Sequence, residues 1–218
     1  MTQPVVAVRG EAFREVDPEV ATFAVTVVAR DRSRDEALRR LASRVDSVRA
    51  VLDGFRDAVE KRETTGLFVH PETKGSGERV VAYHGNVRTV VTVGDFAALG
   101  ELMLRLASEE QTTVDGPWWA LRPGSPAHRE ARRAAITDAL ERAREYAEAL
   151  GARVTGLVEL TDAGLGSQPV TRDGGVRMLA YRAGAAQDQP PSLDLEPQRQ
   201  QVHATVEARL LISEPTLD

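Results

Sequence analysis

Residues 125–160, SPAHREARRAAITDALERAREYAEALGARVTGLVEL, specify a long helix, its end and the strand that follows. Ser125 is placed to cap the first turn, and Pro126 suits the first helical position, where no intrahelical N–H bond is lost. Gly151 is placed to end the helix in a left-handed conformation. Apolar residues at steps of three and four predict a narrow, alanine-rich buried stripe: Ile136, Leu140, Ala143, Ala147 and Leu150. Such small side chains let a helix pack closely on a sheet, and a strand then begins with Leu157, Val158 and Leu160.

Periodic apolar residues predict two further helices. Ser33 and Glu36 form a capping box for the first of them. Its buried stripe is expected to run Leu38, Leu41, Val45, Val48, Leu52, Phe55 and Val59. Asp95 is placed to cap the other helix, whose predicted stripe is Phe96, Leu99, Met103 and Leu106.

Alternating apolar residues predict the strands. A short strand covers residues 4–9 and a charged connection 10–18, followed by a half-buried strand over 20–30. Residues 64–70 and 80–93 are expected to form a hairpin around a turn-rich connection at 71–78, with a bulge or bend at Gly85-Asn86. A strand over 113–121 is broken at 115–117, and a last strand covers 202–212.

These elements predict an α+β protein in which a mainly antiparallel sheet carries long amphipathic helices on one face. We expect residues 1–218 to form a single domain. Residues 20–121 read strand, helix, strand twice over, which suggests an internal duplication. Residues 161–198 are rich in Gly, Gln, Pro and Asp and predict a polar, mobile arm.

Composition excludes several classes of function. The chain has no cysteine, so disulfides, thiol catalysis and cysteine-ligated metals are excluded. A net charge of −5, from 28 basic and 33 acidic residues, argues against a protein dominated by contacts to nucleic-acid phosphates. The first residues show no secretion signal and no stretch is long and apolar enough to span a bilayer, so a cytoplasmic location is expected.

No motif in the chain predicts catalysis. The histidines are His70, His84, His128 and His203, and no two show the close sequence spacing of a metal-binding pair, although convergence through the fold stays open. Lys74 to Arg79, KGSGER, lacks the order of a phosphate-binding loop. Ser125 and Ser167 lie in no nucleophile elbow. We therefore predict no catalytic, cofactor-binding or metal-binding residues.

Trp118-Trp119 is the most unusual local feature. Adjacent residues of a strand face opposite sides, so at least one indole is expected to leave the core. A ring lying beneath a loop or helix, a subunit contact and a ligand platform are the three interpretations, and the subunit contact ranks above the ligand. Met178 and Tyr181, in a short apolar segment of the arm, complete the candidate interface.

Several phrases, in their order, resemble the SIMPL-domain family found widely in bacteria. They are residues 6–27, 35–52, 81–103, 131–160 and 202–212, from VAVRGEAFREVDPEVATFAVTV to VHATVEARLLI. The resemblance implies an α+β fold, a tendency to form homo-oligomeric rings as in some periplasmic relatives, and a loose link to envelope or oxidative-stress physiology. It supplies no catalytic residues. The chain departs from the commoner bacterial pattern because it shows no export signal.

Three functional hypotheses follow. The first is a non-enzymatic, self-associating cytoplasmic protein, such as a stress-related scaffold, that uses sheet edges, Trp118-Trp119 and the arm for contacts. The second is a small-ligand-binding protein or enzyme whose pocket is assembled from residues distant in sequence. The third, binding of nucleic acid through the arginine-bearing helix faces, fits the acidic net charge least well.

Overall fold

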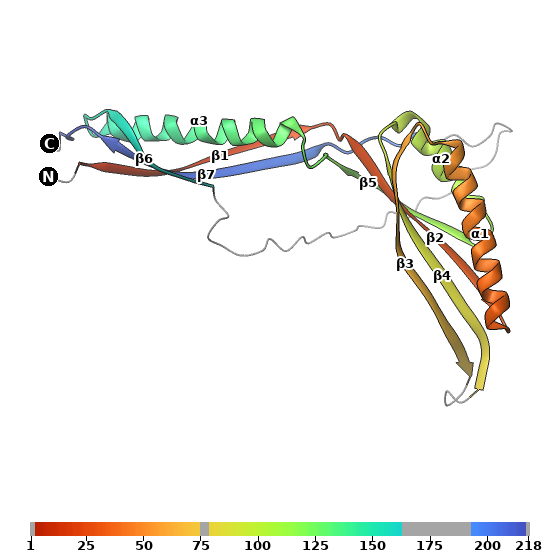
Figure 1. Ribbon diagram of the computed structural model, residues 1–218. Helices are drawn as coiled ribbons and strands as arrows, with labels where there is room; N and C mark the ends of the chain where they lie inside the picture. The colour runs from red at the N-terminus through yellow and green to blue at the C-terminus, as the bar shows by residue number, and fades with distance from the viewer. Residues whose placement is uncertain (1–2, 75–78, 163–192, 217–218) are drawn as a thin grey trace, which may run out of the picture. The chain divides into compact units, whose positions relative to one another are not determined.

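The computed structural model describes residues 3–74, 79–162 and 193–216, which fall into two compact units (Figure 1). The described residues divide into a terminal unit, residues 3–16, 123–162 and 201–216, and a central unit, residues 17–74, 79–122 and 193–200. Each unit has its own sheet and its own hydrophobic core.

The central unit contains two helices and a sheet. Its elements are β2 (Val20–Asp31), α1 (Arg34–Gly54), β3 (Val59–Lys74), β4 (Arg79–Val93), α2 (Phe96–Ala107) and β5 (Thr112–Ala120). The sheet order is β3-β4-β2-β5, and all neighbouring strands are antiparallel. The predicted order of strand, helix, strand, twice over, is confirmed, and the strand order is that of a ferredoxin-like fold.

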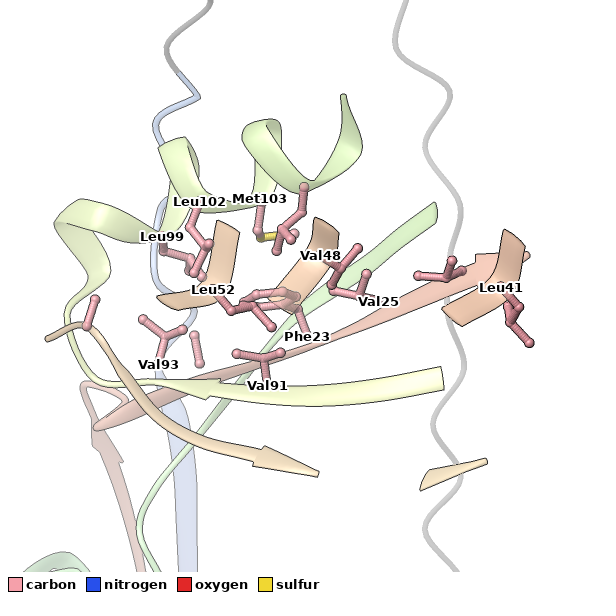
Figure 2. Close-up of a cluster of buried hydrophobic side chains, with 14 of the residues drawn as sticks. Phe23, Val25, Leu41, Val48, Leu52, Val91, Val93, Leu99, Leu102 and Met103 are labelled. Atoms are coloured by element: carbon pink, nitrogen blue, oxygen red, sulfur yellow. The ribbon is translucent and has the colours of Figure 1, made fainter. Parts of the chain in front are cut away.

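The core of the central unit lies between its helices and one face of its sheet. Alternate residues of β2, among them Phe23, Val25 and Val27, are buried against residues of α1 and α2. Figure 2 shows Leu102 and Met103 of α2 directed towards Phe23. The predicted α2 stripe is confirmed, since Leu99, Met103 and Leu106 are buried and Phe96 packs against them, and the Asp95 side chain accepts a hydrogen bond from the Ala97 N–H.

The terminal unit contains one helix and three strands. Its elements are β1 (Val5–Val16), α3 (Pro126–Ala149), β6 (Val154–Asp162) and β7 (Gln200–Ile212), with the sheet order β1-β7-β6. The alternation predicted for β7 is observed, with five side chains buried and Ala204 half-buried. The buried ones are Val202, Val206, Ala208, Leu210 and Ile212.

The two ends of α3 are as predicted. The Ser125 hydroxyl accepts a hydrogen bond from the Ala127 N–H, with Pro126 at the first helical position. Gly151 has a φ of 64°. The Gly151 N–H donates to the Glu148 carbonyl at 2.9 Å and the Ala152 N–H to the Ala147 carbonyl at 2.8 Å. This pair of bonds is a Schellman motif, which satisfies the last carbonyls of the helix.

The buried stripe of α3 differs from the prediction. It consists of alanines four residues apart: Ala127, Ala131, Ala135, Ala139, Ala143 and Ala147. Ile136 and Leu140 border it half-buried, and Leu150 is exposed. The reason is Gly10 of β1, because a Cβ added there would lie 2.6 Å from the Ala139 nitrogen and would also meet the Ala135 carbonyl oxygen. At Gly10 the helix backbone approaches β1 so closely that Ala135 and Ala139 leave no room for larger side chains.

Three strand predictions are corrected. Residues 10–16 continue β1 instead of forming a connection, and residues 71–74 continue β3. The bulge expected at Gly85-Asn86 is absent, because Gly85 pairs in unbroken register with Ala29 and Val69. Gly85 is explained by the approach of α1, since an added Cβ would lie 3.1 Å from Leu41 Cδ2.

The end of α1 and the arm also differ from the sequence-based description. α1 ends at Gly54, so Val59 begins β3 and does not extend the helical stripe. Of residues 161–198, Thr161 and Asp162 end β6, while Leu195 packs on the central core. Residues 163–192, with Met178 and Tyr181, lie outside the described residues. In the part of the chain that the structure describes, every helix is too short or too polar to cross a membrane.

Candidate functional site

The tandem tryptophans of β5 occupy different environments. Trp119 lies against the central core, and its ring meets Phe96 of α2 edge-on, with centroids 4.9 Å apart and an interplanar angle of 80°. Trp118 faces the other side of the sheet and is 43% exposed. Trp119 therefore anchors β5 to α2, and Trp118 is the indole available to a partner.

Strand register places Trp118 on a face of the central sheet that we call the open face, defined by Thr22, Arg30, His70, His84 and Trp118. Thr22 is opposite Trp118, Arg30 is opposite His84, and His84 is opposite His70. Directly opposed residues share a face. The buried residues of β2, which α1 and α2 cover, point to the other side.

The two edges of this sheet, β3 and β5, carry exposed apolar side chains. Leu67 and Phe68 of β3 are 62% and 63% exposed. Because neighbouring residues of a strand point to opposite faces, β3 is uncovered on both faces at this point. In the described part of the chain, β3 pairs only with β4, and β5 pairs only with β2.

Charged and imidazole groups gather on the open face near the β3–β4 hairpin. The rings of His70 and His84 have centroids 5.3 Å apart and an interplanar angle of 39°. Arg30 Nε and Nη2 donate to the Glu72 carboxylate at 2.6 and 3.1 Å. The Arg30 guanidinium, with smaller effects from His84 and His70, holds the pKa of Glu72 below its ordinary value. We call His70, His84, Arg30 and Glu72 the histidine cluster.

Sequence spacing alone missed the histidine pair. His70 and His84 are fourteen positions apart in the sequence, and the antiparallel pairing of β3 with β4 places them opposite one another. Counting outward from the middle of the predicted 71–78 connection pairs His70 with Arg79 and not with His84. The pairing with His84 follows only from the observed register, which shifts between Glu72 and Thr73.

Two hollows in the surface are candidate ligand sites. One, of about 230 Å³, lies between α1 and the β3 side of the sheet; Val27, Val45, Val48 and Leu52 form its apolar part, and its polar part includes Arg49 and Arg62. Arg49 Nη1 lies 3.2 Å from Asp46 Oδ1, and Arg62 Nη1 lies 2.6 Å from Asp53 Oδ1. The other, of about 630 Å³, lies over the terminal sheet, where Arg9 pairs with Glu207 at 2.9 Å. Ion pairs thus satisfy the charges at both hollows.

Comparison with known proteins settles the family. A model of the SIMPL family, described as a protein of unknown function (DUF541), matches residues 6–210. The chain belongs to the SIMPL family. A search of curated proteins gives no match. The SIMPL match extends over both units, and its description assigns no reaction.

Proposed function

We propose that this SIMPL protein is non-enzymatic and acts by self-association through the edges of its central sheet. The observation that carries the proposal is the exposure of Leu67 and Phe68 on β3, a long edge strand. An exposed apolar edge strand offers unpaired N–H and C=O groups together with apolar side chains, which favours pairing with another chain.

Features at both ends of β3 restrict the proposed contact to the middle of the strand. Residues 60–63 are all charged, and Pro71 lacks an N–H. The register of β3 with β4 shifts between Thr64 and Gly66. Charges, proline and bulges are the devices by which edge strands avoid pairing. The proposed contact is the segment between the bulge and Pro71, which contains Leu67 and Phe68. It has no charged residue, proline or bulge.

The β5 edge provides the second surface. The register of β5 with β2 shifts between Thr22 and Ala24, and Gly116 has a φ of 126°. The predicted break at 115–117, which includes Pro117, is therefore present and hinders strand pairing along this edge, so the proposed contact of β5 is the side chain of Trp118. Trp118 follows the break and projects its ring from the open face. Two different edges on one subunit support head-to-tail assembly, which closes into a ring when the rotation allows it.

Substitution of the exposed aromatic residues tests this function. We expect Phe68→Ser and Trp118→Ser to weaken self-association about thirtyfold each, since a buried aromatic contact in an interface contributes roughly 2 kcal/mol or more. Tyr146→Ser is the matched control, because Tyr146 is an exposed aromatic residue of α3. Light scattering after size exclusion measures the mass. Equal association of all three variants and the wild type would refute the proposed edges.

Small-ligand binding is the second candidate function, favoured by the hollow between α1 and the sheet. Its volume of about 230 Å³ is below the roughly 300–1,000 Å³ usual for ligand pockets, so it would hold only a small molecule. A thermal-shift screen of metabolites tests it. A hit that Val45→Trp abolishes would support the ligand, and a screen without hits would remove this candidate.

We infer that the two units serve one SIMPL domain. The ferredoxin-like strand order supports descent of β2-α1-β3 and β4-α2-β5 from a duplicated unit, because exchanging the halves reproduces the same order. A stress-related scaffold in a bacterium is the role that the family resemblance supports.

A further inference from the structure

The histidine cluster adjoins the proposed contact on β3, because His70 lies two residues from Phe68, and its paired rings have a geometry of their own. His70 and His84 come from neighbouring strands, and Arg30 continues the same row on β2. Opposed positions on antiparallel strands hold their side chains close, and the strand backbones fix the spacing. The rings are thus brought together by the hairpin and not by a flexible loop.

The spacing of the two rings fits a shared metal ion. A metal bound to imidazole at about 2.1 Å from nitrogen lies about 3.2 Å from the ring centre, and two such ligands at a tetrahedral angle have centres about 5.2 Å apart. The His70 and His84 centroids are 5.3 Å apart. Little movement of the backbone is then needed to bring a nitrogen of each ring to one ion.

One ring nitrogen of His84 makes no hydrogen bond to the described residues. Its Nδ1 is buried and has no hydrogen-bond partner among the described residues. Buried polar atoms are almost always paired, and one that is not requires an explanation. Ligation needs a ring nitrogen that no hydrogen bond occupies, and His84 Nδ1 meets this condition.

We propose that His70 and His84 form a chelating pair for a late first-row divalent metal ion such as Cu²⁺, Ni²⁺ or Zn²⁺. Imidazole suits these ions, and copper is expected to bind most tightly of the three. Among the described residues no group of three His, Asp or Glu side chains is arranged to hold a metal. The pair therefore supplies two ligands, and solvent or a partner molecule completes the coordination.

Glu72 makes the surroundings favourable for a cation. It lies two residues from His70 on the same strand and pairs with Arg30 through both carboxylate oxygens. Its negative charge offsets the guanidinium, which would otherwise repel a metal beside His84.

Titration of the untagged full chain with Cu²⁺ tests the proposal. Electron paramagnetic resonance reports the nitrogens that coordinate copper, and calorimetry gives the stoichiometry and affinity. We expect one copper per chain with two imidazole nitrogens, and an affinity at least about tenfold lower in His70→Gln or His84→Gln than in the wild type. His128→Gln is the matched control, because His128 lies on α3 in the terminal unit.

Several outcomes would overturn the proposal. They are no saturable binding by the wild type, equal affinity in the His70, His84 and His128 variants, or a spectrum with a single imidazole nitrogen. Thermal unfolding of each variant without metal establishes that it is folded. His70 lies two residues from Phe68 in the proposed contact, whereas His84 lies on β4. Loss of copper binding in a His84→Gln variant that still self-associates therefore separates this site from the proposed assembly.

Discussion

Gly10→Ala tests the close packing of β1 against α3. An added Cβ would lie 2.6 Å from the Ala139 nitrogen and 2.7 Å from the Ala139 Cβ, and would also meet the Ala135 carbonyl oxygen. Carbon atoms pack best at about 3.5–4.0 Å, so the strand and helix must separate by roughly 1 Å. The obstacle is helix backbone, which no rotamer change relieves.

The size of the effect follows from two opposing contributions. Overpacking of a core costs about 1–3 kcal/mol, and the upper end applies here because the clash is with backbone atoms. Alanine in a strand is favoured over glycine by roughly 0.5–1 kcal/mol. We therefore expect Gly10→Ala to lower the free energy of unfolding of the terminal unit by about 2 kcal/mol.

Hydrogen exchange measured by mass spectrometry locates this loss. Because 1.4 kcal/mol corresponds to about a tenfold change in an equilibrium constant, exchange in α3 should accelerate about thirtyfold. Gly54→Ala is the matched control, since no atom lies within 4 Å of a Cβ added at this last residue of α1. It should stabilise α1 by roughly 0.5–1 kcal/mol. Unchanged α3 exchange in Gly10→Ala would refute the packing argument.

Three further predictions concern the core, a buried cap and acid stability. Phe23→Ala removes a fully buried ring and should cost about 3–5 kcal/mol by tryptophan-monitored urea unfolding. Ser125→Ala removes the cap of α3 and should cost about 1 kcal/mol by thermal unfolding, with Ser125→Thr, which keeps the hydroxyl, as the rescuing variant. The Glu11 N–H, aided by Arg142, holds the pKa of Asp138 below its ordinary value. The ionised Asp138 carboxylate therefore adds to the free energy of unfolding. Its contribution is complete above the unfolded-state pKa and is lost as pH falls through the lower folded-state pKa. Asp138→Asn should therefore flatten the acid side of a plot of unfolding free energy against pH.

Local signals predicted much of the secondary structure. The caps of α2 and α3 and the alternation along β2 and β7 depend on neighbouring residues, and these features were readable. The positions of Gly10 and Gly85 were misread, because each glycine is required by a helix that is distant in sequence. When a helix packs closely on a strand, the sequence of that strand shows no periodic pattern that would reveal the contact.

The candidate sites were less predictable than the fold. Trp118-Trp119 stood out in the sequence, yet only the structure separates the core ring of Trp119 from the exposed ring of Trp118. Leu67 and Phe68 read as ordinary strand residues, since exposure at a sheet edge depends on which strand pairs with which. His70 and His84 likewise acquire meaning only from the register of β3 with β4.

The mass of the untagged wild-type protein in solution tests the central claim of self-association most directly. Light scattering coupled to size exclusion should be run over a wide range of concentration, up to the high micromolar. We predict a discrete assembly several times the 23.7 kDa of one chain, with a mass that does not change on dilution. A mass of one chain at every concentration would contradict the proposal.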